Sequence, residues 1–169
     1  MPNSGENSFE RLSQDVGRVL LANGLTLATA ESCTGGWVAQ VVTETSGSSQ
    51  WFDRGFVTYT NQAKQEMLGV PLETLQRHGA VSEQTVQAMA EGALKNSRAQ
   101  ITLAISGIAG PTGGTADKPV GMVCFAWASA NFPTHTATEY FHGDRTAVRR
   151  QAVHYALHCL IDSIATSPS

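Results

Sequence analysis

The segment LTLATAESCTGG, residues 25–36, passes from a short apolar and β-branched run into a cluster of hydroxyls and glycines. The run at 25–30 predicts a buried strand, and the residues that follow predict a helix over 34–45. A strand that leads directly into a helix is the repeating unit of layered α/β folds. Such a junction also exposes unpaired backbone N–H groups at the positive end of a helix dipole, which suits an anion or a developing oxyanion.

The rest of the chain continues this alternation. Further strands are expected over 52–59, 101–105, 120–128 and 134–141, and helices over 8–22, 62–68, 71–77, 82–94 and from 145 onward. The run at 120–128 is almost continuously apolar, which is typical of a strand buried on both faces, whereas 134–141 is less apolar and is expected near a sheet edge. The pattern predicts one α/β domain at 8–166, preceded by a disordered tail at 1–7.

Composition and charge exclude several classes of protein. The 169 residues carry a net charge of −3, so no global attraction to nucleic acid or to an acidic membrane is expected. No apolar run approaches the roughly 18 residues that span a bilayer, and residues 1–7 lack the features of a secretory signal. Cys33, Cys124 and Cys159 are odd in number and widely spaced, which fits neither a disulfide framework nor a zinc site. We therefore expect a reduced, cytoplasmic protein without a metal.

Three features suggest chemistry, and each also has an ordinary structural explanation. Lys64 follows a predicted strand in a segment with few charges; desolvated, it could serve as a general base for a serine, or it could be a solvated helix lysine. The 13-residue loop at 107–119 is long for a compact domain, and such loops are usually functional or disordered. Arg145 and Arg149 fall four apart on one helix face, where they could clamp a phosphate or simply face solvent.

Seven short motifs occur together and in order: ESCTGG at 31–36, GSSQWF at 47–52, FVTYTNQAK at 56–64, HGAVSE at 78–83, SGIAGPTGG at 106–114, KPVG at 118–121 and HGDR at 142–145. This ordered set closely resembles the CinA C-terminal domain family over roughly residues 8–165. The resemblance implies an α/β three-layer sandwich with a central, largely parallel or mixed sheet of about five strands flanked by helices. It also implies hydrolysis of the carboxamide of nicotinamide mononucleotide to nicotinate mononucleotide and ammonia, in pyridine-nucleotide recycling. It further implies no metal or other cofactor, and self-association, with a homodimer favoured.

The family's site residues carry over to this sequence as a serine–lysine amidase. Lys64 would be the general base, and Tyr59 would help to orient it or shuttle a proton. Two motif serines are available as the nucleophile: we favour Ser49, in the GSS turn, with Ser32 in the proton or oxyanion network, and the exchange of their roles stays open. The expected substrate contacts are the N–H donors around Thr34, Gly35 and Gly36, together with Asn61, Gly107, Gly110, Gly113, Gly114, Arg145 and Arg149.

Two other functions compete with the amidase. A non-catalytic module could bind a nucleotide or a partner in the same pocket, but it would be favoured only if Lys64 or both serines were missing. A phosphoryl-transfer enzyme is suggested by the glycine-rich loops alone and would need a carboxylate to hold a metal, for which Glu31 and Asp117 are the candidates. The chain has no Walker lysine, so this third function is the weakest of the three.

Overall fold

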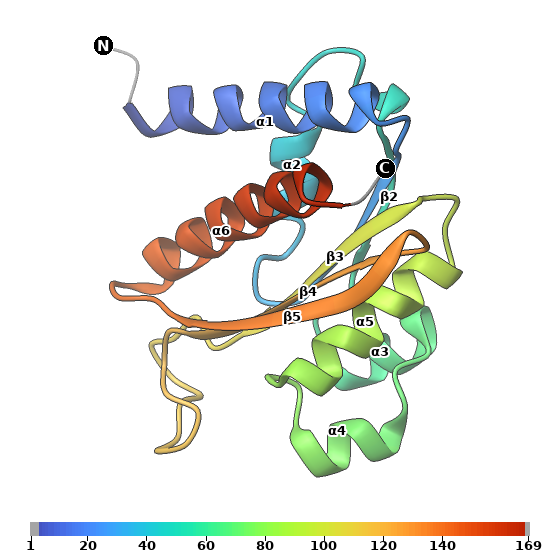
Figure 1. Ribbon diagram of the computed structural model, residues 1–169. Helices are drawn as coiled ribbons and strands as arrows, with labels where there is room; N and C mark the ends of the chain where they lie inside the picture. The colour runs from blue at the N-terminus through green and yellow to red at the C-terminus, as the bar shows by residue number, and fades with distance from the viewer. Residues whose placement is uncertain (1–3, 168–169) are drawn as a thin grey trace.

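The computed structural model describes residues 4–167 and shows a five-stranded sheet between two layers of helices (Figure 1). The strands are β1 (Leu27–Glu31), β2 (Phe52–Val57), β3 (Ile101–Gly107), β4 (Met122–Ser129) and β5 (Phe132–Tyr140). The helices are α1 (Ser4–Ala22), α2 (Trp37–Val42), α3 (Asn61–Leu68), α4 (Leu72–His78), α5 (Glu83–Lys95) and α6 (Arg145–Ala165), and a short 3-10 helix, Ser48–Gln50, precedes β2. The predicted three-layer α/β sandwich is confirmed.

The sheet is mixed, with the strand order β2-β1-β3-β4-β5. Strand β1 runs parallel to both β2 and β3, whereas β4 and β5 are antiparallel to their neighbours. The least apolar strand, β5, lies at an edge, as predicted. Strands β1, β2 and β3 run in the same direction, so their carboxyl ends at Glu31, Val57 and Gly107 lie beside one another. Open α/β sheets bind ligands at the carboxyl ends of their strands.

The two faces of the sheet differ in the size of their side chains. Large side chains such as Phe125 and Trp127 pack against α1, α2 and α6. Small side chains such as Ala104 face the layer formed by α3, α4 and α5. This lets α5 come close to the sheet, so that Thr102 Oγ1 donates to the Ala90 carbonyl at 2.7 Å. The close packing fixes α5 and the segment before it relative to the carboxyl ends of the strands.

Two helices begin three or more residues away from their predicted starts. Helix α1 begins at Ser4, so residues 4–7, which were expected in a disordered tail, continue its backbone; residues 1–3 lie outside the described part of the chain. The extra turn is reasonable because extending a helix costs much less than starting one. Helix α2 begins at Trp37 instead of residue 34, because Gly35 and Gly36 have φ values of 60° and 100°, which a right-handed helix does not allow.

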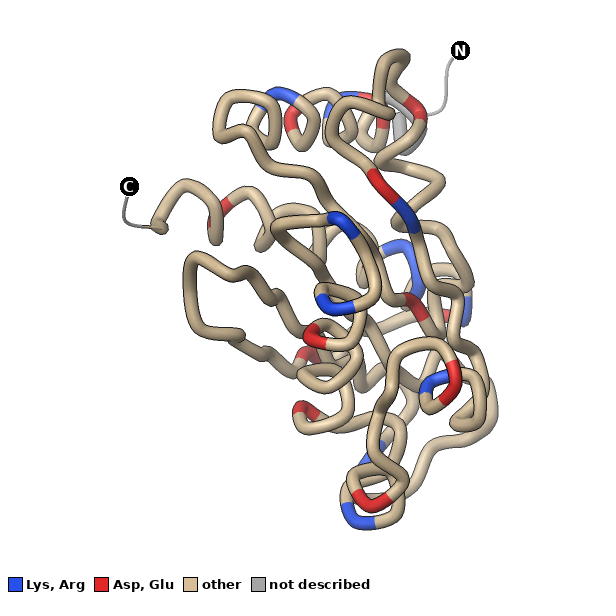
Figure 2. The backbone as a smooth tube through the Cα atoms, turned by 90° about the vertical axis from the view of Figure 1, so that its right-hand side faces the viewer, with Lys and Arg blue, Asp and Glu red and all other residues tan. Residues whose placement is uncertain are grey.

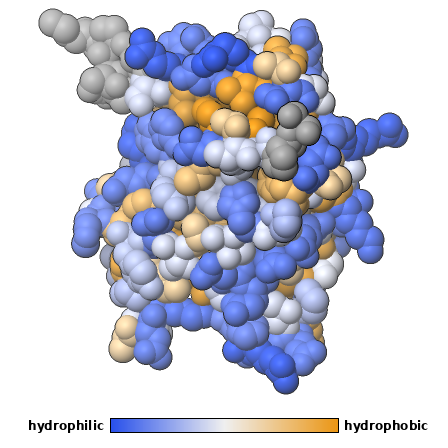
Figure 3. Space-filling model, viewed as in Figure 1, coloured by the Kyte–Doolittle hydropathy of each residue, from blue (hydrophilic) through white to orange (hydrophobic). Residues whose placement is uncertain are grey.

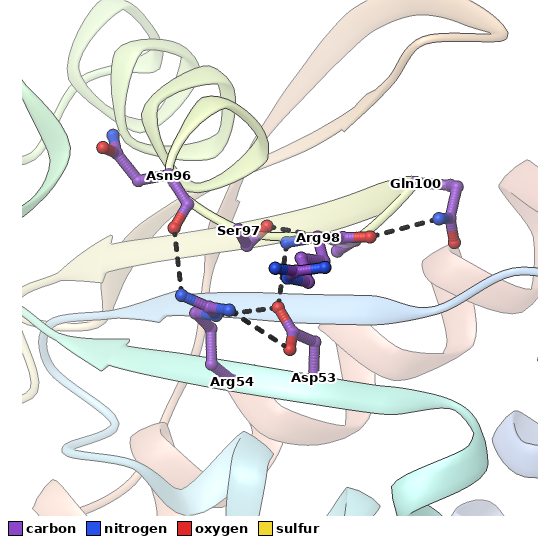
Figure 4. Close-up of polar contacts among 7 residues, drawn as sticks. Asp53, Arg54, Asn96, Ser97, Arg98 and Gln100 are labelled. Carbon is purple, nitrogen blue, oxygen red and sulfur yellow. Dashed lines mark hydrogen bonds and ion pairs between the residues drawn. The ribbon is translucent and has the colours of Figure 1, made fainter.

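A polar cluster holds the other end of the sheet, where β2 begins (Figure 4). Asp53 accepts hydrogen bonds from Arg54 Nε at 2.7 Å and from the backbone N–H of Arg98 at 3.0 Å. These bonds, that of Arg54 first, hold the pKa of the Asp53 carboxyl below its usual value. Arg54 Nη1 also donates to the Asn96 carbonyl at 3.4 Å. The cluster therefore ties β2 to the loop that precedes β3.

The surface has few charges and one visible apolar area. Lys and Arg positions are interspersed with Asp and Glu positions and do not form one continuous basic side in the view of Figure 2. In Figure 3, apolar side chains reach the surface between α1 and α6, and most of the remaining visible face is polar. Within residues 4–167, no helix is both long enough and apolar enough to cross a membrane.

Candidate active site

A pocket of about 220 Å³ opens at the carboxyl ends of the three parallel strands. Its walls come from the segments that follow β1, β2 and β3, from the segment between α4 and α5, and from the start of α6. The residues that line it are Ser32, Cys33, Tyr59, Asn61, Lys64, Ala80, Val81, Ser106, Gly107, Ala109 and Arg145. Six of these, Ser32, Tyr59, Asn61, Lys64, Gly107 and Arg145, are residues that the sequence predicts for the site.

Lys64 is a buried lysine at the centre of this pocket. It lies on α3, whose first turn is fixed by the Thr60 hydroxyl, which accepts from the Ala63 N–H at 3.0 Å. Only 1% of Lys64 is exposed, and its Nζ donates to the Thr58 carbonyl at 2.9 Å and to Ser32 Oγ at 3.1 Å. Burial lowers the pKa of the Lys64 ammonium. A lysine in this setting is more readily neutral than a solvated one and can accept a proton from the adjacent hydroxyl.

Ser32 is held in place by backbone bonds on both sides. Its N–H donates to the Ile105 carbonyl on β3 at 3.0 Å, and its carbonyl accepts from the Gly35 N–H at 3.0 Å. The residue is 8% exposed and lines the pocket. The Oγ atom is therefore fixed next to the Lys64 amine while still accessible from the pocket.

Glu31 anchors the loop that carries Ser32. Its carboxylate accepts from Thr34 Oγ1 at 2.7 Å and from the N–H groups of Val38 and Ala39 at 2.8 and 3.1 Å, at the start of α2. Burial raises the pKa of Glu31, and these bonds oppose that effect. The carboxylate is thus used to hold the loop against α2. Within residues 4–167, no group of three or more His, Cys, Asp or Glu side chains is placed to hold a metal, and Asp117 lies exposed in a loop.

Two of the three arginines of α6, Arg145 and Arg149, have different roles near the pocket. Arg145 lines the pocket, and its guanidinium donates to Tyr59 Oη at 2.8 Å and to the Gly110 carbonyl at 2.8 Å. Tyr59 is therefore bound to Arg145 and not to Lys64, which the sequence analysis expected it to orient. Arg149 is not part of the pocket lining; it donates to the carbonyls of Cys33 and Thr34 at 3.0 and 3.3 Å and so braces the Ser32 loop.

The N–H donors expected from 34–36 are not presented to the pocket. The Gly35 N–H donates to the Ser32 carbonyl, and the Gly36 N–H contributes to the hydrogen bonding of the Glu31 carboxylate. Thr34 is fully buried, with its hydroxyl on Glu31. The positive φ angles of the two glycines turn the loop back on itself, so its amides serve the loop's own structure. In the long loop, Gly107 lines the pocket and Gly110 binds Arg145, but Gly113 and Gly114 are exposed and outside the lining.

Ser49, the serine favoured as the nucleophile, lies at the other end of the sheet. It belongs to the exposed 3-10 helix before β2, whereas Thr58 and Lys64 follow β2. Strands rise by about 3.3 Å per residue, so the six steps from Phe52 to Thr58 place the two ends of β2 about 20 Å apart. Within one chain the structure does not bring Ser49 to Lys64, and the serine that it does bring there is Ser32.

Ala80, Val81 and Ser106 line the pocket and were not proposed from the sequence. Two signals could have found them. The motif HGAVSE at 78–83 is one of the seven family motifs, but no residue in it is assigned a role from the sequence. Ser106 stands at the carboxyl end of a predicted buried strand, as Ser32 does. Ala80 and Val81 carry no chemical group, so composition alone could not mark them.

Comparison with known proteins agrees with this fold. Residues 9–164 match the CinA C-terminal domain. The chain is 58% identical over 155 residues to the nicotinamide-nucleotide amidohydrolase PncC of Escherichia coli strain K12, covering 92% of this chain and 94% of the relative. It is also 54% identical to a putative competence-damage inducible protein of Symbiobacterium thermophilum, of which it covers 37%. Among solved structures, the competence/damage inducible protein CihA of Agrobacterium tumefaciens superposes with a TM-score of 0.89 at 47% identity, over 94% of this chain and 96% of that one.

A match over nearly the whole chain, at identities well above those of chance resemblance, is decisive for membership. The protein belongs to the CinA C-terminal domain family.

Proposed function

We propose that this chain is a nicotinamide-nucleotide amidohydrolase that converts nicotinamide mononucleotide to nicotinate mononucleotide and ammonia, with Ser32 as the nucleophile and Lys64 as the general base. The observation that carries the mechanism is the 3.1 Å contact between Lys64 Nζ and Ser32 Oγ inside a pocket. The substrate is supported by the 58% identity to the Escherichia coli enzyme over most of both chains. This assignment gives Ser32 the role that the sequence favoured for Ser49, and Ser49 takes no part in it.

The chemistry uses the neutral form of Lys64. One amine N–H remains on the Thr58 carbonyl, which leaves the nitrogen lone pair for the Ser32 hydroxyl proton. As that proton moves to Nζ, Ser32 Oγ attacks the carboxamide carbon and forms a tetrahedral intermediate. Lys64 then returns the proton to the leaving nitrogen, which departs as ammonia and leaves an ester on Ser32. A water, deprotonated by the same amine, hydrolyses that ester to the carboxylate and restores the serine.

The developing oxyanion needs N–H donors near Ser32. Cys33, the residue directly after the nucleophile, lines the pocket, and we assign its backbone amide as the donor. Its loop is held by the two bonds from Arg149 and by the Glu31 carboxylate on the neighbouring turn, so the amide keeps its direction during the reaction. A donor that is already oriented costs no reorganisation when the charge forms.

The phosphate of the substrate is assigned to Arg145. Apart from Lys64, it is the only Lys or Arg among the residues described as lining the pocket. A guanidinium can bind two phosphate oxygens at once. Here its bonds to Tyr59 Oη and to the Gly110 carbonyl already fix its orientation. Asn61 lies in the same wall and supplies an amide for the ribose hydroxyls. We further propose that the protein acts in the cytoplasm and as a homodimer, and that it requires no cofactor.

Ammonia release from nicotinamide mononucleotide tests this function directly. The wild-type protein should release ammonia and form nicotinate mononucleotide in equal amounts, and Lys64→Ala should lose this activity. A wild-type protein whose melting temperature rises with the nucleotide while no product forms would identify a binding module instead. Full activity of Lys64→Ala would exclude the serine–lysine mechanism while leaving the substrate assignment intact.

A further inference from the structure

Lys118, which the proposed mechanism does not use, connects two walls of the pocket. It lies half-buried in the segment 107–121 that follows β3, the segment whose first residues, Gly107 and Ala109, line the pocket. Its Nζ donates to the backbone carbonyl of His78, at the end of α4. A few residues further on, Ala80 and Val81 form another wall of the same pocket. One ammonium thus joins two segments that are about 40 residues apart in the chain.

The segment that carries Lys118 is ordered by its own hydrogen bonds. At its base, Ile108 and Gly121 are joined by the Gly121 N–H donating to the Ile108 carbonyl at 2.7 Å. Nearer its tip, the Thr115 N–H donates to the Lys118 carbonyl at 2.8 Å, and the Lys118 N–H donates to Thr115 Oγ1 at 3.1 Å. The second pair of bonds fixes the backbone of Lys118 itself. The backbone that carries the ammonium is therefore held by two local hydrogen bonds to Thr115.

The segment on the other side is built to receive it. Gly79 has a φ of +77°, and a Cβ built on it would lie 3.0 Å from Lys118 Nζ, so the absence of a side chain leaves the space that the ammonium occupies. The Gly79 carbonyl accepts from Ser82 Oγ at 3.0 Å and from Thr85 Oγ1 at 2.7 Å, which ties it to the start of α5. Two successive carbonyls are thus held by different parts of the chain, that of His78 by Lys118 and that of Gly79 by Thr85 of α5.

We propose that Lys118 is a positioning residue that sets the width of the substrate pocket by holding the wall formed by Ala80 and Val81 against the wall formed by Gly107 and Ala109. Lys118 contributes to substrate binding and not to the chemical step, because its ammonium is bonded to His78 and not to Ser32 or Lys64. The kinetic part of this inference rests on the proposed function. Its structural part, the tethering of 78–83, does not.

The test compares Lys118→Met with Lys118→Arg and with Lys95→Met in the full-length protein. Methionine keeps an unbranched apolar stem but removes the donor, and arginine restores a donor that can reach a carbonyl. Lys95 is the matched control, since it lies exposed at the end of α5 and takes no part in the pocket. Amide hydrogen exchange is followed in peptides that span 78–83 and 107–121, and KM and kcat for nicotinamide mononucleotide are measured on the same preparations.

Lys118→Met should speed exchange at 78–83 severalfold and raise KM about fivefold with kcat within twofold, which is the scale of one lost charge-assisted hydrogen bond at a half-exposed site. Lys118→Arg should recover most of both effects, and Lys95→Met should show neither. Unchanged exchange at 78–83 in Lys118→Met would overturn the tether, and a fall in kcat at constant KM would overturn the role in binding. Inactive wild-type protein would refute the proposed function alone, because the exchange result needs no turnover.

Discussion

Replacing each of the two motif serines by alanine gives the sharpest test of the active site. Ser32→Ala removes the hydroxyl that lies 3.1 Å from Lys64 Nζ, and we expect kcat to fall by at least about 1,000-fold, as when the nucleophile of a serine hydrolase is removed. Ser49→Ala alters an exposed hydroxyl at the far end of β2, and kcat should stay within about twofold of the wild type.

Loss of folding cannot mimic this result. The Ser32 hydroxyl makes one described hydrogen bond, and Lys64 Nζ keeps its bond to the Thr58 carbonyl when that hydroxyl is removed. The expected cost is about 1 kcal/mol. For a domain of this size such a change lowers the melting temperature by only about 2–4 °C. The variant should therefore be folded, and its inactivity should be chemical in origin.

The assay measures ammonia release together with the melting temperature of each variant and the intact mass of rapidly quenched wild-type reactions. A transient ester should be found on the peptide that contains Ser32. The reasoning is refuted if Ser32→Ala keeps substantial activity while Ser49→Ala loses it, since that pattern would require the 3-10 helix at 48–50 to act in an active site that the single chain does not form.

Three further predictions concern groups with shifted pKa values. Burial lowers the pKa of Lys64, so kcat/KM should rise with pH along a limb whose midpoint lies below the pKa of an ordinary lysine, and a flat profile would contradict this assignment. Between that lowered pKa and the ordinary one the folded state binds fewer protons than the unfolded state, so stability should also rise with pH across that window. Glu31→Ala should lower stability by about 2–4 kcal/mol, seen as an earlier urea midpoint, because it leaves two buried donors, Thr34 and Val38, and the part-buried Ala39 N–H without their carboxylate. The pKa of Asp53 is lowered, first by its hydrogen bond from Arg54, so its contribution to stability is present above the unfolded pKa and is lost as pH falls through the folded pKa. Asp53→Asn should therefore destabilise at pH 7, by an amount that shrinks when the urea midpoint is measured at progressively lower pH, and an equal effect at every pH would refute the ion-pair explanation.

Much of the fold could be predicted because its signals are local. The continuously apolar run at 120–128 became β4, whose six central residues are buried, and the weaker run at 134–141 became the edge strand β5. Asp144 was expected to precede a long helix, and its carboxylate does accept from the Ala147 N–H at the start of α6. Each of these features depends on residues that are close together in the sequence, so a pattern along the chain is enough to find it.

The hydrogen-bond partners of the site could not be predicted in the same way. The 34–36 segment looked like a set of donors aimed at substrate, because a glycine-rich turn before a helix often is one. Its amides instead serve Ser32 and Glu31, which follows from the φ values of Gly35 and Gly36 and from the burial of the Glu31 carboxylate. Residue type alone determines neither the sign of a glycine φ nor the direction in which a buried carboxylate points. The same holds for Tyr59, whose partner Arg145 is 86 residues away.

The choice between the two serines is a different kind of question, because the sequence holds information that bears on it directly. Ser49 precedes the predicted strand at 52–59 and Lys64 follows it, and a strand of that length separates its two ends by about 20 Å. No rearrangement of side chains can close that distance within one chain. Ser32 follows its own strand, and two parallel neighbours necessarily bring Ser32 and Lys64 to the same edge. Where motifs flank parallel strands, the position of each motif before or after its strand is therefore a stronger guide to which side chains can react together than the chemistry of the motif itself.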